Sequence, residues 1–101
     1  MEDEREVILI LNDRRLDTNA ALRLETNLCR SLDGVTKLVI DMAAVVYVSS
    51  SSLRVLLAAQ HAMGDKEGSI TLRNVCDDVL HILEITGFTE IFTVERKKEA
   101  R

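Results

Sequence analysis

The sequence contains no proline and no tryptophan, and only one tyrosine and two phenylalanines occur among its 101 residues. Few aromatic rings are therefore available to stack on bases or sugars. The formal net charge of −4 at pH 7, with no basic stripe to offset it, also argues against a nucleic-acid partner. The longest apolar run, residues 7–11, is far too short to span a bilayer, so we expect no direct membrane insertion.

Cysteine is also scarce, since Cys29 and Cys76 are the only two. Neither belongs to a CxxC motif or to a Cys/His spacing typical of zinc, so no metal site is expected. In a reducing compartment both would be small core or near-surface residues, and a disulfide between them is the alternative. Residues 1–6 are acidic and unlike a secretory signal, so we expect a cytoplasmic protein.

What the sequence does contain is typical of one folded domain, with 47% hydrophobic and 30% charged residues. We predict a single domain over residues 1–101, with a charged tail at 95–101 that could form a frayed helix. The expected strands are residues 7–11, 37–42, 69–74 and 90–94. The expected helices follow the caps at Asp17, Thr18 and Asn19, start again at about Ser52, and run from Asp77 to Gly87.

This order of elements is β-α-β-α-β-α-β, with connections short enough for right-handed parallel crossovers. The apolar run at 7–11 predicts a strand buried on both faces. The alternation at 69–74 predicts a strand with one wetter face, near an edge of the sheet. The predicted fold class is therefore α/β, a small, mainly parallel or mixed sheet of about four strands covered by helices.

No catalytic residue or cofactor site is predicted. The serines lack the G-x-S-x-G elbow of hydrolases, and no dinucleotide or phosphate-binding glycine loop is present. His61 and His81 fall inside predicted helices, where each is better explained as a surface residue than as a general base. We therefore expect a protein that is not an enzyme.

Four consecutive serines, residues 49–52, lie between the second predicted strand and the second predicted helix. A serine hydroxyl there can cap the helix, and it can also be a regulatory phosphorylation site, because phosphate is favoured at a helix N-terminus. Asp17 and Asp41 lie at or near the ends of strands, at the same edge of the sheet. The structural roles open to them are a helix cap for Asp17 and a hydrogen bond to nearby backbone for Asp41.

Several segments together resemble the STAS domain, in its anti-sigma factor antagonist branch. These are residues 16–17 (LD), 38–42 (LVIDM), 47–57 (YVSSSSLRVLL) and 82–92 (ILEITGFTEIF). The family motif reads Asp-Ser-(Ser, Thr or Ala)-Gly-Leu. With Leu53 on the motif leucine, the resemblance implies that Ser50 is the phosphorylated serine, with Ser51 as the second choice. It also implies the STAS fold, with three or four helices on the sheet.

The resemblance further implies the partners. When unphosphorylated, such a protein binds an anti-sigma factor that is also a serine kinase and thereby frees a sigma factor; a PP2C-type phosphatase resets the cycle. Phosphate adds about −1.5 to −2 charges, which could repel a partner surface beside Asp17 and Asp41. The residues expected to bind the partner are Asp17, Thr18, Asn19, Ser49, Ser51, Ser52 and Arg54.

The alternative is a structural STAS subunit that is not phosphorylated and scaffolds a transporter or another multiprotein complex. Exposed sheet edges would also allow a homodimer. The chain departs from the family pattern at three places. Ser49 replaces the aspartate, Ser52 replaces the glycine, and Arg14 and Arg15 stand near the position of the usual glycine after the first strand. The segment before the first strand is also short for the family's usual hairpin.

Overall fold

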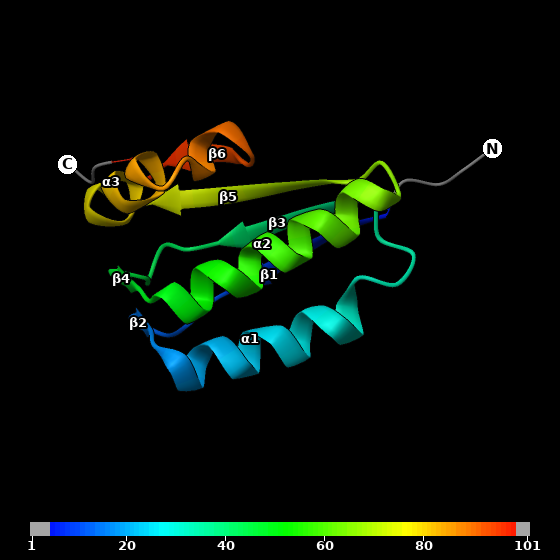
Figure 1. Ribbon diagram of the computed structural model, residues 1–101, viewed down its shortest axis with the longest axis horizontal. Coiled ribbons are helices and arrows are strands. Elements are labelled where there is room, and N and C mark those ends of the chain that lie inside the picture. Colours follow the sequence, from blue (N-terminus) through cyan, green and yellow to red (C-terminus); the bar gives the residue numbers. More distant parts are fainter. Residues whose placement is uncertain (1–4, 99–101) are drawn as a thin grey trace.

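The computed structural model describes residues 5–98, and its centre is a four-stranded sheet whose strands all run parallel (Figure 1). The strand order is β1-β3-β5-β6. The strands are β1 (Glu6–Ile10), β3 (Lys37–Asp41), β5 (Ser69–Val75) and β6 (Thr93–Arg96). The predicted α/β fold with a small parallel sheet is confirmed.

Three α-helices connect these strands: α1 (Thr18–Ser31), α2 (Ser50–Asp65) and α3 (Asp77–Ile85). Figure 1 shows α1 and α2 side by side, running in the same direction with their N-termini at the same end of the molecule. Apolar side chains of the sheet, such as Leu38 and Ile40, join Leu56 and Met63 of α2 in one core, all fully buried. No helix within residues 5–98 is long and apolar enough to cross a membrane.

The edge position of β1 corrects one prediction. We expected this strand to be buried on both faces, but Ile8 and Ile10 are 51% and 61% exposed. Among the described residues β1 pairs only with β3, and its side chains alternate between the core face and an open face. The uninterrupted apolar run therefore does not indicate a central strand here. β5 was predicted near an edge, but it pairs with both β3 and β6 and so lies inside the sheet.

In the C-terminal segment the last strand starts later than predicted. Gly87 adopts a left-handed conformation (φ = +81°) directly after the C-cap of α3, so it does end this helix. A short 3-10 helix, η1 (Phe88–Glu90), follows, and the rings of Phe88 and Phe92 stack with centroids 5.5 Å apart. The last strand therefore starts only at Thr93. The tail predicted as a frayed helix begins within β6, and its residues 99–101 lie outside the described part.

A second, two-stranded sheet was not predicted. β2 (Arg15–Leu16) pairs in parallel with β4 (Tyr47–Val48), and each strand is two residues long. Asp17 and Ser49 follow these strands directly and begin α1 and α2. This small sheet therefore fixes the starts of the two helices next to each other.

Candidate functional site

The start of α2 is built by two of the four serines. Ser49 is the N-cap, and its hydroxyl accepts a hydrogen bond from the Ser52 backbone N–H at 3.1 Å. The Ser52 hydroxyl accepts one from the Ser49 N–H at 2.9 Å and donates to the Ser49 carbonyl at 2.7 Å. These reciprocal bonds form a capping box, which satisfies N–H groups that the first helical turn leaves free.

The other two serines, Ser50 and Ser51, are the first residues of α2, which starts two positions earlier than we predicted. Ser50 is exposed and Ser51 is half-buried. Neither hydroxyl forms a hydrogen bond with any residue in the range 5–98. The two roles considered for the serines are thus divided, because capping occupies Ser49 and Ser52 and leaves Ser50 and Ser51 chemically available.

The adjacent start of α1 supplies the other residues that were expected in the site. Asp17 is the N-cap of α1, and its Oδ1 accepts a hydrogen bond from the Ala20 N–H at 3.0 Å. The Ser49 N–H donates to the Leu16 carbonyl at 3.0 Å, which ties the two helix starts together. The helix-cap role considered for Asp17 is confirmed, and the carboxylate remains exposed beside the serines.

Three of the predicted partner-binding residues line one surface pocket of about 380 Å³. They are Thr18 from α1 and Ser51 and Arg54 from α2. Asn19 is exposed on the first turn of α1 but does not line this pocket. Ser52 is 0% exposed, because its hydroxyl is committed to the cap; its contact with a partner stays a prediction.

Asp41 does not belong to this site. Its Oδ1 accepts hydrogen bonds from the Ala43 N–H at 3.0 Å and from the Asn74 side chain at 3.2 Å. It alternates along β3 with the core residues Leu38 and Ile40, and so it lies on the face of the sheet turned away from α2. Acidic residues near the serines are therefore Asp17, the N-cap of α1, and Glu25, which lines a pocket with Ser51. The hydrogen bond to nearby backbone considered for Asp41 is confirmed.

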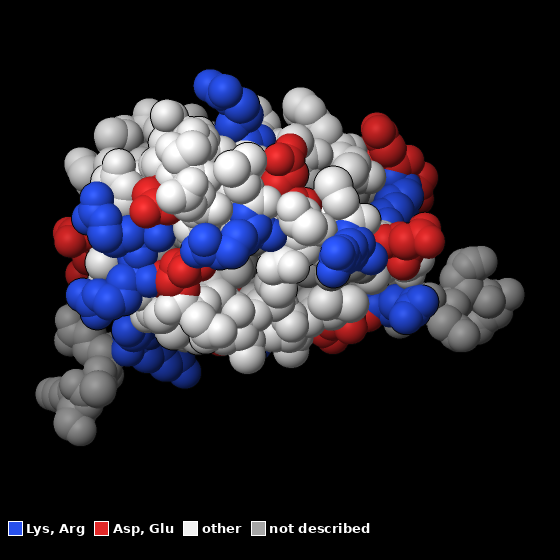
Figure 2. Space-filling model, turned by 90° about the horizontal axis from the view of Figure 1, so that it is seen from below, with Lys and Arg blue, Asp and Glu red and all other residues white. Residues whose placement is uncertain are grey.

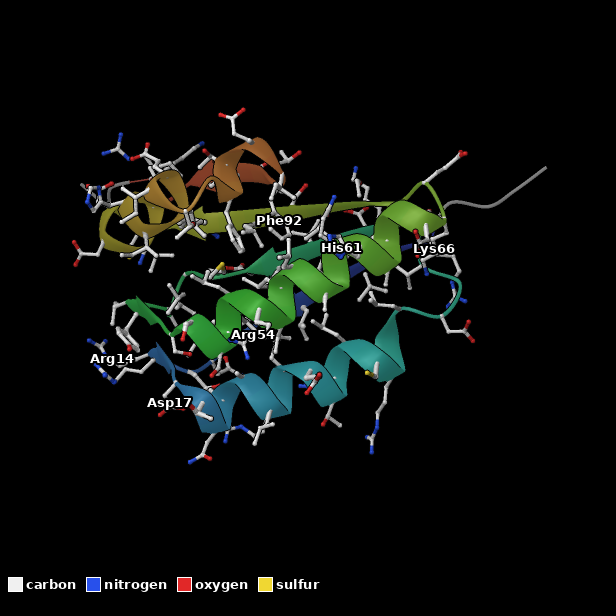
Figure 3. The ribbon with its side chains drawn as sticks, viewed as in Figure 1. Arg14, Asp17, Arg54, His61, Lys66 and Phe92 are labelled. Carbon is white, nitrogen blue, oxygen red and sulfur yellow. The ribbon has the colours of Figure 1, made fainter. Side chains whose placement is uncertain are left out.

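Basic side chains lie at the same end of the molecule. Figure 3 shows Arg14, Asp17 and Arg54 where the two helices begin, while His61 and Lys66 lie farther along α2. The Arg15 guanidinium lies 4.3 Å from the centre of the Tyr47 ring across the small sheet, a cation–π contact. Figure 2, viewed from the α1 side, shows Lys and Arg groups gathered toward this left-hand end. The surface around the serines therefore carries both signs of charge.

The sequence analysis did not include the apolar residues of this surface, of which Leu22 is an exposed leucine. Leu22 is 58% exposed and lines the same pocket as Thr18 and Ser51. The signal was present, because Leu22 falls outside the stripe of apolar residues that includes Leu24 and Leu28. An exposed leucine next to a predicted site is the pattern to look for.

Other chemistry is not indicated in residues 5–98. No group of three or more His, Cys, Asp or Glu side chains is arranged to hold a metal ion there. His61 and His81 are exposed, as expected for helix-surface residues. Cys29 and Cys76 are both free, the first exposed on α1 and the second half-buried before α3.

Comparison with known proteins agrees with this geometry. The sequence matches the family model of the STAS domain over residues 2–100. The chain belongs to the STAS domain family. A curated relative of this STAS domain carries the name "Putative anti-sigma factor antagonist BtrV" in Bordetella bronchiseptica; it is 33% identical over 81 residues, covering 79% of the chain and 70% of BtrV.

Solved structures share the fold at lower sequence identity. The STAS domain superimposes on the anti-sigma factor antagonist SpoIIAA in its unphosphorylated form with a TM-score of 0.78 and 17% identity, covering 93% of the chain and 83% of SpoIIAA. A sulfate transporter family protein from Wolinella succinogenes gives the same TM-score of 0.78 at 18% identity, covering 96% of the chain and 81% of that protein. The STAS fold of the anti-sigma factor antagonist type, expected from the sequence, is confirmed. At these identities the similarity is evidence for the fold alone.

Proposed function

We propose that this protein is an anti-sigma factor antagonist whose binding is switched by phosphorylation of Ser50. The observation that carries the proposal is the division of the serines, because Ser50 is exposed at the first position of α2 while Ser49 and Ser52 hold the cap. A kinase can therefore reach Ser50, and the bonds that start the helix do not involve its hydroxyl. The name of the relative BtrV supports the same function.

In the unphosphorylated state the exposed residues at the two helix starts would bind an anti-sigma factor that is also a serine kinase. Thr18, Ser51 and Arg54 line the shared pocket, and Asp17 lies at its α1 side. Binding sequesters the anti-sigma factor and releases the sigma factor. The protein acts by binding, without catalysis of its own, and this function requires the cytoplasm, where ATP and sigma factors meet.

Phosphorylation would change the charge of this surface without unfolding it. A phosphate on Ser50 adds about −1.5 to −2 charges at the N-terminus of α2, where free N–H groups favour an anion. Arg54, one turn further along α2, can pair with it. A partner surface matched to Arg54 and to the neutral serine would then be repelled. A difference of about 3 kcal/mol suffices to weaken binding on the order of a hundredfold.

The test uses the purified anti-sigma factor kinase that phosphorylates the wild-type chain with ATP and Mg²⁺. Calorimetry should show that Ser50→Ala binds with or without ATP, whereas Ser50→Asp binds at least tenfold more weakly than wild type. Ser51→Ala removes the second candidate acceptor and should still be phosphorylated, on Ser50. Equal binding by the two Ser50 variants, or phosphate found by mass spectrometry on Ser51 alone, would contradict the proposal. A PP2C-type phosphatase should restore binding.

The competing function is a scaffold in a transporter or another complex. The equal fold similarity to a sulfate transporter family protein means that the fold does not separate the two functions. A scaffold predicts stable co-purification with a transporter subunit that ATP does not change. Pull-down from native extract with and without ATP therefore distinguishes them, because only the switch predicts ATP-dependent release.

A further inference from the structure

A long apolar groove runs between α1 and α2, starting at Ser51, next to the proposed phosphorylation site. The pocket of about 380 Å³ that holds Thr18 and Ser51 continues into a second pocket of about 260 Å³, and the two share Glu25, Val55 and Ala58. The second pocket extends along the helices away from the serines. It is lined by Glu25, Leu28, Cys29, Leu32, Val55, Ala58, Ala59 and Ala62.

The shape of the groove suits a helix. Away from the serines its residues on α2 include three alanines, of which Ala58 and Ala62 are exposed, so the groove is shallow and open to solvent there. Small side chains let a third helix approach closely, at the distance of about 8–10 Å usual between packed helices. Leu22, 58% exposed on the α1 side, provides an apolar contact beside the serine end. Figure 2 shows uncoloured surface between the charged groups on this side of the molecule.

Two charged residues along the groove define which charges a docked helix must carry. Arg54 lies at the serine end, and Glu25 lies where the two pockets meet. Neither has an ion-pair partner among residues 5–98. A complementary helix would therefore have an apolar stripe, an acidic side chain facing Arg54 and a basic side chain facing Glu25.

We propose that the α1–α2 groove is the docking site for an amphipathic helix of the anti-sigma factor, which lies along the groove with one end beside Ser50. This inference rests on the proposed function and deepens it, because it gives the partner a second contact far from the phosphorylation site. Ala62 is eleven residues from Ser51, about 16 Å along the helix axis. The groove thus supplies affinity and partner selection, and the phosphate controls release at one end.

The experiment uses the same purified anti-sigma factor kinase and compares groove-filling variants with a control. Ala58→Leu and Ala62→Leu put bulk into the groove while keeping a good helix former. His61→Leu is the matched control, since His61 is exposed on the same helix but lines neither pocket. Calorimetry should show binding weakened at least tenfold by each alanine variant and within about twofold of wild type for the control. Circular dichroism of all three variants confirms that they fold.

A charge variant sharpens the same test. Glu25→Lys should weaken binding about tenfold, and the loss should be smaller at high salt, as expected for an electrostatic contact. If Ala62→Leu bound the kinase with wild-type affinity while Ser50→Asp still bound it weakly, the groove proposal would be refuted. The proposed function would then still stand. Self-association of the wild-type chain in sedimentation, abolished by Ala62→Leu, would overturn it in favour of a second copy in the groove. No kinase binding by any variant or by wild type would refute both proposals.

Discussion

The four serines can be separated experimentally by their effect on stability, with Ser52→Ala as the decisive change. Its hydroxyl is fully buried, accepts from the Ser49 N–H at 2.9 Å and donates to the Ser49 carbonyl at 2.7 Å. Both bonds are lost in the alanine variant. However, the Ser49 N–H still donates a hydrogen bond to the Leu16 carbonyl at 3.0 Å. The Ser49 carbonyl still accepts one from the Leu53 N–H at 3.0 Å.

Because no backbone group of Ser49 is left without a partner, the larger penalty for a buried unsatisfied group does not apply. The expected cost is that of a lost cap interaction, about 1 kcal/mol of unfolding free energy. Ser49→Ala should cost a similar ~1 kcal/mol, because it removes the acceptor for the Ser52 N–H. Ser50→Ala and Ser51→Ala should stay within about 0.5 kcal/mol of wild type, as for other surface substitutions.

The assay is urea unfolding followed by far-ultraviolet circular dichroism, since the chain has no tryptophan. In a thermal scan the Ser49 and Ser52 variants should melt about 4–8 °C below wild type, the shift usual for ~1 kcal/mol in a domain of this size. The assignment of the capping box would be refuted if Ser52→Ala unfolded at the wild-type urea midpoint. It would equally fail if Ser50→Ala lost as much stability as Ser52→Ala.

Two further predictions concern the packing beneath the site, and the same unfolding assay checks both. Leu56→Ala should cost about 2–5 kcal/mol, because Leu56 is fully buried in the core and its truncation leaves a cavity; a loss below 1 kcal/mol would show that α2 is loosely packed on the sheet. Gly68→Ala should cost about 1–3 kcal/mol, since a Cβ there would lie 2.9 Å from the Thr36 carbonyl oxygen and 2.9 Å from the Met63 side chain. Gly64→Ala is its control, because no atom outside the helix lies within 4 Å of that Cβ, and an equal loss there would contradict the steric argument.

The main elements were predictable because their signals are local. The stripe of Ala20, Leu24 and Leu28 marks α1, and Asp17 before it is an ordinary N-cap. The candidate site was indicated by the four serines between a strand and a helix, together with their resemblance to the STAS family motif. Even so, the sequence alone did not say which serine caps and which is free, because that depends on the hydrogen bonds of Ser49 and Ser52.

What could not be predicted depends on contacts between distant segments. β2 and β4 are too short to show any periodicity, and their pairing places Arg15 opposite Tyr47, far apart in the chain. The exposure of Ile8 follows from the edge position of β1, which the strand's own residues do not encode. The delayed start of β6 follows from packing, because Phe88 and Phe92 stack before the strand begins.

The small β2–β4 sheet explains why a phosphate on Ser50 should act on the partner rather than on the fold. It holds Leu16 against Ser49, and the capping box then fixes the first turn of α2 independently of the Ser50 hydroxyl. A phosphate at a helix N-terminus favours the helix, so we expect a chain phosphorylated on Ser50 to keep its structure. The added negative charge should then affect only the exposed surface around Arg54. Stability and switching should therefore be separable, with Ser52→Ala affecting the first and Ser50→Asp the second.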